Sequence, residues 1–398
     1  MENAFQKLWR EIFWGINRKM VPFLIWKKFG KFPKIYGDEL PSPPFIMVAN
    51  HANFFDPWIV AHLSKKPVSI MMNDDGFKSS PVQQWYLKNI GAFPKKKGMS
   101  DVNAIKKSIS EIKSGYPLLI FPEGQTSWDG ETQPIFAGIE KMAKKLSLPI
   151  VAFRIEGNFI ARPWWADFDR KGQISVCIKQ ISAEFVKNKT PDEIRDEFVN
   201  HIKTNDVEKS RDNKFLGKNI VSGMKNLLWI CPSCGEKENL IFEGNSVSCQ
   251  KCKKEFVFNA NLYLENPVSS VKNLYDWVKM QKNDVRNVLN NAKCSDILTQ
   301  NNKIRLIQSD NNGNIVTLDV GTLQISKEKF LFLGDYAKYD IAMDDVVAPV
   351  FQHKNIIQFE YLGGELKFMF LHTSMIKYLY FLREIKGYSE VEKRGYFV

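Results

Sequence analysis

Short apolar runs alternate with helical patterns from residue 45 to about residue 180. The apolar runs predict buried strands, and the segments with apolar residues every three or four positions predict helices. The strands are expected over residues 45–49, 68–72, 117–121, 149–155 and 173–178, and the helices over residues 57–63, 101–114, 137–146 and 190–202. Strands that alternate with helices predict an α/β fold with a mostly parallel sheet flanked by helices. In such sheets the reactive turns follow the carboxyl ends of the strands.

The first 35 residues have a different pattern. Leu8, Ile12 and Ile16 recur at the spacing of one helix face, and lysines follow at positions 27, 28, 31 and 34. Pro22 is expected to divide this segment into two short helices, because proline removes a backbone donor. An aromatic-rich helix pair beside lysines fits the headgroup layer of a membrane. The alternative is that the apolar stripe packs on the rest of the protein.

The C-terminal part predicts short strands and one closing helix. A helix that carries Trp277 comes first, and strands are expected over residues 304–308, 315–319, 322–325, 329–333, 346–350, 356–361 and 365–370, with an apolar helix over residues 372–385. Turn signals include Asn311-Asn312-Gly313. This part resembles pleckstrin-homology and GRAM domains in architecture, which implies lipid-headgroup or protein docking; the alternative is a stabilising accessory domain.

The predicted division is residues 1–35 for membrane-associating helices, 36–209 for the α/β domain, 210–260 for a linker and cysteine-rich ribbon, and 261–398 for the mainly-β domain.

Charge and composition point to an anionic partner. The chain has 398 residues, with 56 Lys and Arg against 44 Asp and Glu, which gives a net charge of +12. Such a balance favours nucleic acid or a lipid surface. The aromatic content of 13%, with ten Trp, favours the membrane, because Trp and Tyr prefer interfaces that are wet on one side. No apolar stretch reaches about 18 residues, so no spanning helix is predicted.

Four of the six cysteines form two C-x2-C pairs, Cys231 with Cys234 and Cys249 with Cys252. Two such pairs at this separation can place four thiolates tetrahedrally around one zinc ion. The site has no open position for substrate, so the predicted zinc is structural. Clustered cysteines also suit a reducing compartment better than a disulfide framework.

The candidate chemistry is an acid–base pair, His51 and Asp56, which follows the predicted strand at residues 45–49. A neutral imidazole accepts a proton from an alcohol, and a carboxylate on its other ring nitrogen fixes the tautomer. Alone, this spacing is more often a surface turn with an incidental histidine and aspartate. A second polar turn, which contains Glu123, follows the strand at residues 117–121 and favours the catalytic alternative.

Four blocks in this order resemble the glycerolphosphate acyltransferases, in particular the 1-acylglycerol-3-phosphate acyltransferases. The first block is N-H-x4-D, with Asn50, His51 and Asp56. The second is the turn Gly91–Lys97, in which Gly91, Phe93 and Lys97 are the motif positions. The third block is Phe121-Pro122-Glu123-Gly124, and the fourth is Leu148-Pro149-Ile150-Val151. The resemblance covers roughly residues 30–205. It implies that His51, oriented by Asp56, acts as general base, and that Asn50, Gly91, Phe93, Lys97, Glu123 and Gly124 contact the substrate.

The chain departs from the family pattern at three positions. Lys97 and Thr126 replace the arginines of the second and third blocks, and Ala152 replaces a proline of the fourth. Lysine keeps the charge of arginine but loses its bidentate fork. Lys95, Lys96, Arg154 and Arg162 are candidates for compensating charge at the acceptor's phosphate.

The resemblance implies transfer of an acyl group from coenzyme A or acyl carrier protein to a lysophospholipid, without a catalytic cofactor or covalent acyl-enzyme. The expected partners are an anionic membrane surface, the lysophospholipid and the acyl thioester donor, and the expected location is cytoplasmic, peripheral on the membrane. The alternative is a zinc-ribbon adaptor that binds lipid or nucleic acid through a degenerate acyltransferase domain. No nucleic-acid-binding signature accompanies the lysines around the second cysteine pair, so nucleic acid is not expected as a partner.

Overall fold

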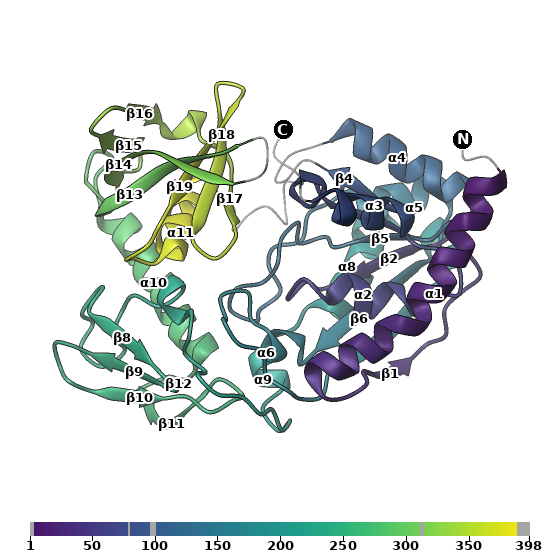
Figure 1. Cartoon of the computed structure of the whole chain (residues 1–398), viewed down its shortest axis with the longest axis horizontal. Coiled ribbons are helices and arrows are strands. Elements are labelled where there is room, and N and C mark those ends of the chain that lie inside the picture. Colours follow the sequence, from purple (N-terminus) through teal and green to yellow (C-terminus); the bar gives the residue numbers. More distant parts are fainter. Residues whose placement is uncertain (1–3, 79, 96–100, 311–313, 388–398) are drawn as a thin grey trace. The chain divides into compact units, whose positions relative to one another are not determined.

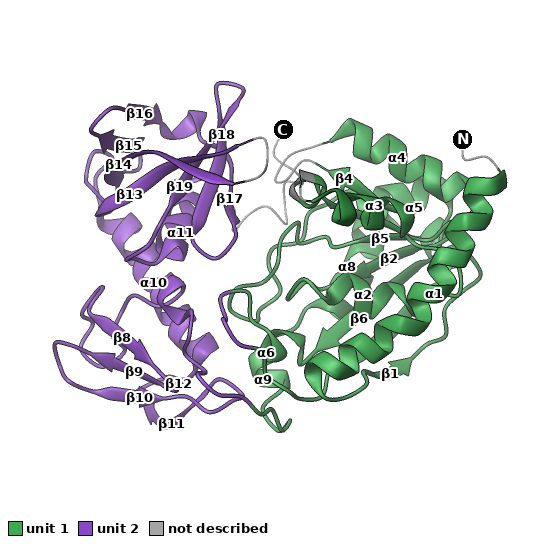
Figure 2. Ribbon diagram, viewed as in Figure 1, with its two compact units in different colours: residues 1–164, 169–216, 391–398 green, residues 165–168, 217–390 purple. Residues whose placement is uncertain are grey.

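The computed structural model describes residues 4–78, 80–95, 101–310 and 314–387 (Figure 1). The chain divides into two compact units, coloured separately in Figure 2. Described residues of 1–164 and 169–216 form the first unit, and those of 165–168 and 217–390 form the second. The four-part division predicted from the sequence stays a prediction.

A seven-stranded sheet forms the centre of the first unit, in the order β1-β7-β6-β2-β5-β3-β4. Its strands are β1 (Lys34–Gly37), β2 (Ile46–Ala49), β3 (Ser69–Asn73), β4 (Ala92–Lys95), β5 (Leu118–Ile120), β6 (Ile150–Glu156) and β7 (Ser175–Ile181). The neighbouring strands are parallel, and the exception among the described pairings is the antiparallel pair of β6 with β7. The predicted α/β fold with a mostly parallel sheet is therefore confirmed. The parallel arrangement also places the carboxyl ends of β2, β5, β3, β4 and β6 at one edge.

Helices cover this sheet because alternate strand residues point to opposite faces. On one face, Ile46 and Val48 of β2 share a buried apolar cluster with Ile112, Ala143 and Phe198 of three helices. The helices of the unit are α1 (Ala4–Phe29), α2 (Asp56–Ala61), α3 (Pro81–Asn89), α4 (Val102–Lys113), α5 (Ile139–Leu146), α6 (Asn158–Ala161), α7 (Ala183–Asn188), α8 (Pro191–Ile202) and α9 (Asp206–Lys209).

Helix α1 is continuous from Ala4 to Phe29, so the predicted division at Pro22 is wrong. Proline inside a helix costs about 3 kcal/mol. Packing offsets this cost, because buried side chains lie on both sides of the proline. They are Trp14 and Val21 before it, and Ile25 and Phe29 after it. Buried side chains on both sides of Pro22 hold the two halves in one helix.

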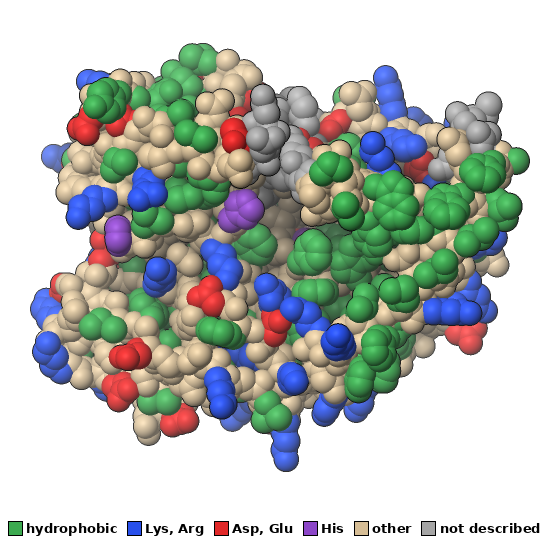
Figure 3. Space-filling model, in the orientation of Figure 1, with side chains coloured by type: hydrophobic (Ala, Val, Ile, Leu, Met, Phe, Trp, Pro, Cys, Tyr) green, Lys and Arg blue, Asp and Glu red, His purple; other side chains and the backbone are tan. Residues whose placement is uncertain are grey.

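The apolar residues of α1 divide between two faces, so the predicted packing on the protein holds for one face and the predicted membrane contact stays a prediction. One stripe packs on the unit, and a second stripe of large apolar side chains stays exposed: Phe5, Leu8, Trp9, Ile12, Ile16, Met20, Phe23, Leu24 and Trp26. Figure 3 shows these hydrophobic side chains as a band that follows α1. None of the described helices is both long enough and apolar enough to cross a membrane.

A buried arginine fixes α1 to the interior. The Arg10 guanidinium donates to Oε2 of Glu111 in α4 and to Oγ of Ser69 in β3, both at 2.8 Å. The guanidinium also lies 3.9 Å from the ring centroid of Tyr116. Arg10 is 5% exposed, so the ion pair is shielded from solvent and joins three elements.

The second unit begins with small sheets and a long helix. Strands β8 (Leu240–Glu243), β9 (Ser246–Cys249) and β10 (Glu255–Val257) form an antiparallel ribbon. Strands β11 (Tyr263–Val268) and β12 (Val271–Asn273) then lead into α10 (Leu274–Asn291). Trp277 of α10 packs on Phe256 and Phe258, which ties the helix to the ribbon.

A seven-stranded antiparallel sheet and a buried helix complete this unit, in the strand order β16-β15-β14-β13-β19-β18-β17. Its elements are β13 (Thr299–Ser309), β14 (Ile315–Ile325), β15 (Lys329–Gly334), β16 (Lys338–Ala342), β17 (Val347–Gln352), β18 (Ile356–Tyr361), β19 (Gly364–Met369) and α11 (Met375–Ile385). The mainly-β prediction with a closing helix is confirmed. Two strands predicted at residues 315–319 and 322–325 are one strand, β14, and β16 was not predicted. The turn predicted at residues 311–313 lies outside the described residues.

Candidate functional site

His51 and Asp56 form a hydrogen-bonded pair at the carboxyl end of β2. Asp56 is the first residue of α2, and its Oδ2 atom accepts from Nδ1 of His51 at 2.7 Å. The same oxygen accepts from the backbone N–H groups of Ala52 at 2.5 Å and Asn53 at 2.9 Å. Asp56 is 0% exposed, whereas the His51 side chain is 18% exposed. The loop thus wraps around a buried carboxylate and leaves one edge of the imidazole accessible.

The turn after β5 holds the backbone of His51. Glu123 accepts from the His51 N–H at 2.5 Å through Oε1 and from the Gln133 N–H at 2.6 Å through Oε2. The Ser127 N–H donates to the His51 carbonyl at 2.7 Å. The His51 ring also stacks on Phe121, with ring centroids 4.3 Å apart. The third block therefore fixes the histidine in place.

Glu123 is a buried carboxyl with both oxygens engaged. Burial is the main reason that its pKa lies well above the usual range, and the charges of Asp56 and Asp129 raise the pKa further. The backbone donors of Gln133 and His51 oppose this shift. The contacts described for Glu123 are internal, and its assignment to substrate binding stays a prediction.

Asn50 and Asn158 connect the site to β6. The Asn50 side chain donates to the Ile155 carbonyl at 2.9 Å and accepts from the Ile155 N–H at 2.7 Å, so it extends the sheet pairing beyond β2. Asn158 follows β6 and donates its side-chain amide to Oδ1 of Asp56. Motif reasoning missed Asn158, although its position after a parallel strand places it at the reactive edge.

The second block lies at β4. Phe93 is buried in the apolar core, and Gly91 has a positive φ of 88°. A Cβ atom on Gly91 would overlap the Arg10 guanidinium and the Val68 carbonyl, so only glycine fits beside α1. Lys96 and Lys97 lie outside the described residues. The substrate contacts predicted for Gly91, Phe93 and Lys97 stay predictions.

The candidate compensating charges differ in their surroundings. Arg154 donates to Glu156 at 2.7 Å, and Arg162 pairs with Asp169. Carboxylates therefore already neutralise both arginines. Lys95 ends β4 at the reactive edge, and burial lowers the pKa of its ammonium to about 8, with Asp101 acting in the opposite direction.

Gly124 lies in the same turn as Glu123, in the left-handed region with φ of 67°. Its N–H donates to the Phe121 carbonyl at 3.1 Å, which closes the turn. The five residues Asn50, His51, Asp56, Glu123 and Gly124 thus lie in two turns that are hydrogen-bonded to one another.

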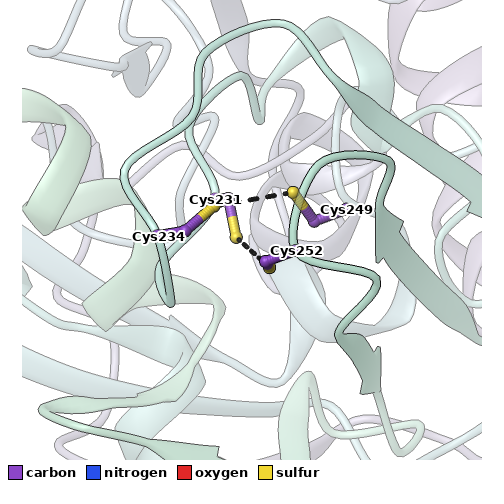
Figure 4. A group of neighbouring side chains, drawn as sticks. All are labelled: Cys231, Cys234, Cys249 and Cys252. Carbon is purple, nitrogen blue, oxygen red and sulfur yellow. Dashed lines mark hydrogen bonds between the residues drawn. The ribbon is translucent and has the colours of Figure 1, made fainter.

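The four cysteines form a separate cluster in the second unit (Figure 4). Their sulfur atoms all lie within 4.8 Å of one another, with Cys231 3.8 Å from Cys252 and Cys234 3.7 Å from Cys249. Four sulfurs at about 2.3 Å from one zinc ion would be separated by about 3.8 Å in a regular tetrahedron. The cluster therefore fits a zinc ion.

The two cysteine pairs have the same turn geometry. The Gly235 N–H donates to the Cys231 carbonyl and the Lys253 N–H donates to the Cys249 carbonyl, both at 2.9 Å. Gly235 and Lys253 both have positive φ, 73° and 61°. Lys251 pairs with Glu236 at 2.5 Å, so one of the lysines considered for nucleic-acid binding is neutralised locally.

Residues 33–156 match the family model described as Acyltransferase. The chain is 30% identical over 125 residues to a chloroplastic 1-acyl-sn-glycerol-3-phosphate acyltransferase of Brassica napus, a match that covers 30% of this chain and 36% of the relative. It is 28% identical over 142 residues to a 1-acyl-sn-glycerol-3-phosphate acyltransferase of Streptococcus pneumoniae, which covers 35% of this chain and 53% of the relative. The chain thus spans about a third to a half of the length of these relatives. A crystal structure of the PlsC acyltransferase of Thermotoga maritima aligns with a TM-score of 0.42 and 17% identity, over 51% of this chain and 81% of that one.

Proposed function

We propose that this chain, whose residues 33–156 form a domain of the acyltransferase family, transfers a fatty acyl group from a thioester to the hydroxyl of a lysophospholipid. The main observation in support of this proposal is the hydrogen-bonded pair of His51 and Asp56. Its buried carboxylate holds Nδ1, and no described residue forms a hydrogen bond with Nε2. The accessible nitrogen is thus the one left to take a proton.

In the proposed reaction, Nε2 of His51 removes the proton from the acceptor hydroxyl. The oxygen attacks the thioester carbonyl, the tetrahedral intermediate expels the thiolate, and the imidazolium returns the proton to that sulfur. The ester bond forms and the carbon–sulfur bond breaks, without a cofactor or a covalent acyl-enzyme. Asp56 keeps Nδ1 protonated and stabilises the imidazolium.

Backbone donors for the oxyanion are available in the turn after β5. The N–H groups of Gln125 and Thr126 donate to no acceptor within the described part of the chain. The adjacent Ser127 N–H binds the His51 carbonyl, so this turn runs beside the histidine. Fixed donors of this kind stabilise charge that develops at a carbonyl oxygen.

The proposed acceptor is 1-acylglycerol-3-phosphate, which would give phosphatidic acid. Two relatives that match this chain carry the name of that activity. Lys95 supplies a positive charge at the reactive edge, two positions before the predicted contact Lys97 in the sequence. The donor is proposed to be acyl-CoA or acyl carrier protein, both of which present the same thioester.

The proposed location is the surface of an anionic membrane. The exposed stripe of α1 continues at Val82 and Trp85 of α3, which are 76% and 53% exposed. Phe13 links the two helices, with its ring centroid 5.5 Å from that of Trp85. Phe54, two residues before Asp56, is 56% exposed and contacts Trp58. A lipid acceptor could thus reach His51 from the bilayer.

A structural zinc ion in the Cys231–Cys252 cluster completes the proposal. The four residues Cys231, Cys234, Cys249 and Cys252 would hold it, and four thiolates leave no position for substrate.

The test is release of free thiol from palmitoyl-CoA and from palmitoyl-acyl carrier protein in the presence of lysolipids with and without a phosphate monoester. We expect His51→Ala to lower the acceptor-dependent rate by about 10²–10⁴-fold, the usual contribution of general base catalysis. The matched control is His372→Ala, an exposed histidine in the second unit. Full turnover by His51→Ala would overturn the proposal.

The adaptor alternative predicts a different result. A chain that binds nucleic acid tightly, with a steep dependence on salt, and releases no thiol with any lysolipid would favour it over acyl transfer.

A further inference from the structure

We infer that Asn158 is a positioning residue, which acts on His51 through Asp56. This inference rests on the proposed function, in which His51 is the general base. Asn158 follows β6 and is 0% exposed, and its amide donates to Oδ1 of Asp56.

The two oxygens of Asp56 have different partners. Oδ2 accepts from the local loop, through the His51 ring and the N–H groups of Ala52 and Asn53. Oδ1 accepts from Asn158, which lies 102 residues away in the sequence. No other described residue donates to this oxygen. Asn158 therefore supplies the donor that stops the carboxylate from rotating away from Nδ1.

The side chain of Asn158 is oriented toward this one contact. Its own Oδ1 atom is buried and accepts no hydrogen bond within the described residues. A buried acceptor without a partner costs stability, and such groups in folded proteins call for an explanation. Here the Asn158 side chain leaves its oxygen without a donor and directs its N–H group to the buried carboxylate of Asp56, where a charge-assisted hydrogen bond is strong.

The backbone around Asn158 is held independently of its side chain. Asp206 accepts from the Gly157 N–H at 2.5 Å and the Phe159 N–H at 2.8 Å, on either side of Asn158. The Asn158 carbonyl accepts from the Asn53 amide at 2.8 Å. Because these contacts use backbone atoms of residues 157–159, a change of the Asn158 side chain leaves them in place.

Two substitutions separate a donor role from a packing role. Asn158→Asp keeps the shape, removes the donor and sets a second carboxyl against Asp56, whereas Asn158→Leu keeps a similar volume and removes all polarity. We expect kcat to fall by about 10- to 100-fold in both variants, with KM for donor and acceptor unchanged within about twofold, since one charge-assisted bond is lost. A packing role would make Asn158→Asp the milder change and leave kcat of the folded fraction unaltered, which would overturn the inference.

A double-mutant cycle tests the route of the effect. In the background of Asp56→Asn, Asn158→Leu should cause no further loss of kcat, because Asn158 acts through that carboxylate. Independent, multiplicative losses would contradict the inference. The control is Ser182→Ala, which removes the side-chain cap of α7 in the same unit and is expected to lower the melting temperature without changing kcat.

A spectroscopic measurement distinguishes failure of this inference from failure of the proposed function. Nitrogen-15 NMR reports which ring nitrogen of His51 carries the proton, whether or not the chain releases thiol. Asn158→Leu should reduce the Nδ1–H population, and an unchanged tautomer would overturn the inference. If Asn158→Leu reduces the Nδ1–H population and the wild-type chain releases no thiol, the positioning role stands and the acyltransferase proposal fails.

Discussion

At the scale of single residues, His51 is fixed by three segments that lie far apart in the sequence. Asp56 binds its ring, Glu123 and Ser127 bind its backbone, and Asn158 binds Asp56. Glu123 and Ser127 follow β5, and Asn158 follows β6, in the same sheet as β2. The geometry of the candidate base is therefore a property of the sheet edge as a whole.

Lys95 gives a pH prediction at this scale. Its ammonium has a pKa lowered to about 8 by burial, so it is charged below pH 8 and becomes neutral above it. A phosphate monoester is already doubly ionised there, with a second pKa of about 6. KM for 1-acylglycerol-3-phosphate should thus rise by up to about tenfold per pH unit above 8.

Initial rates from pH 7 to 10 check this prediction, with monoacylglycerol as the phosphate-free acceptor. Lys95→Met should raise KM for the phosphate-bearing acceptor at pH 7 and flatten its dependence on pH. The same rise for both acceptors would show that the titrating group is not a phosphate contact.

The sequence identified only part of this residue network. His51 and Asp56 are five positions apart and Glu123 belongs to a recognisable turn, so local motifs revealed all three. The contact of Asn158 with Asp56 depends on the pairing of β2 with β6, a long-range arrangement that no local pattern encodes. The internal role of Glu123 was equally hidden, because a motif gives a residue's identity and not the direction of its side chain.

At the scale of elements, long-range packing explains where the predictions were wrong. Pro22 lowers local helix stability, yet burial of Trp14, Val21 and Ile25 keeps α1 whole. Gly321 interrupts the apolar pattern of β14, yet its pairing with both β13 and β15 continues the strand. In both places the break in the pattern is local, and long-range packing overrides it.

The cluster of Cys231, Cys234, Cys249 and Cys252 leads to a prediction about zinc content and stability. Purified protein should contain about one zinc ion per chain, and Cys231→Ser together with Cys249→Ser should abolish binding. We expect the melting temperature of the second unit to fall by about 10 °C or more, because a structural zinc site contributes several kcal/mol to folding.

Atomic absorption and calorimetry provide the measurements. Cys294→Ser is the matched control, since Cys294 is an exposed cysteine outside the cluster. Full zinc content in the double variant, or none in wild-type protein grown with zinc, would contradict a four-cysteine site.

At the scale of the whole molecule, membrane binding is expected to depend on the exposed stripe of α1. Ile16→Glu and Phe23→Glu replace side chains that are 53% and 54% exposed. Each should weaken binding to vesicles of phosphatidylcholine and phosphatidylglycerol by about tenfold or more, because burial of a large apolar side chain is worth about 1.5–3 kcal/mol. Binding should also weaken with added salt, since lysines follow the stripe.

Co-sedimentation with vesicles measures this effect. Leu318→Glu serves as the control, because Leu318 is 50% exposed in the second unit and lies outside the stripe. Equal losses for Leu318→Glu and Phe23→Glu would mean that the stripe has no special part in lipid binding.

The buried contacts of Arg10 have a mechanical consequence for such a surface helix. An amphipathic helix joined by a flexible linker can rock on a bilayer without disturbing the rest of its protein. Here Arg10 joins α1 to Glu111 and Ser69. Separation of the helix from the rest of the unit would leave the buried Glu111 carboxylate without Arg10, its buried ion-pair partner. Lateral pressure and curvature in the bilayer would therefore act as a load on β3 and α4, so that turnover on small, strongly curved vesicles should differ from turnover on large, flat ones.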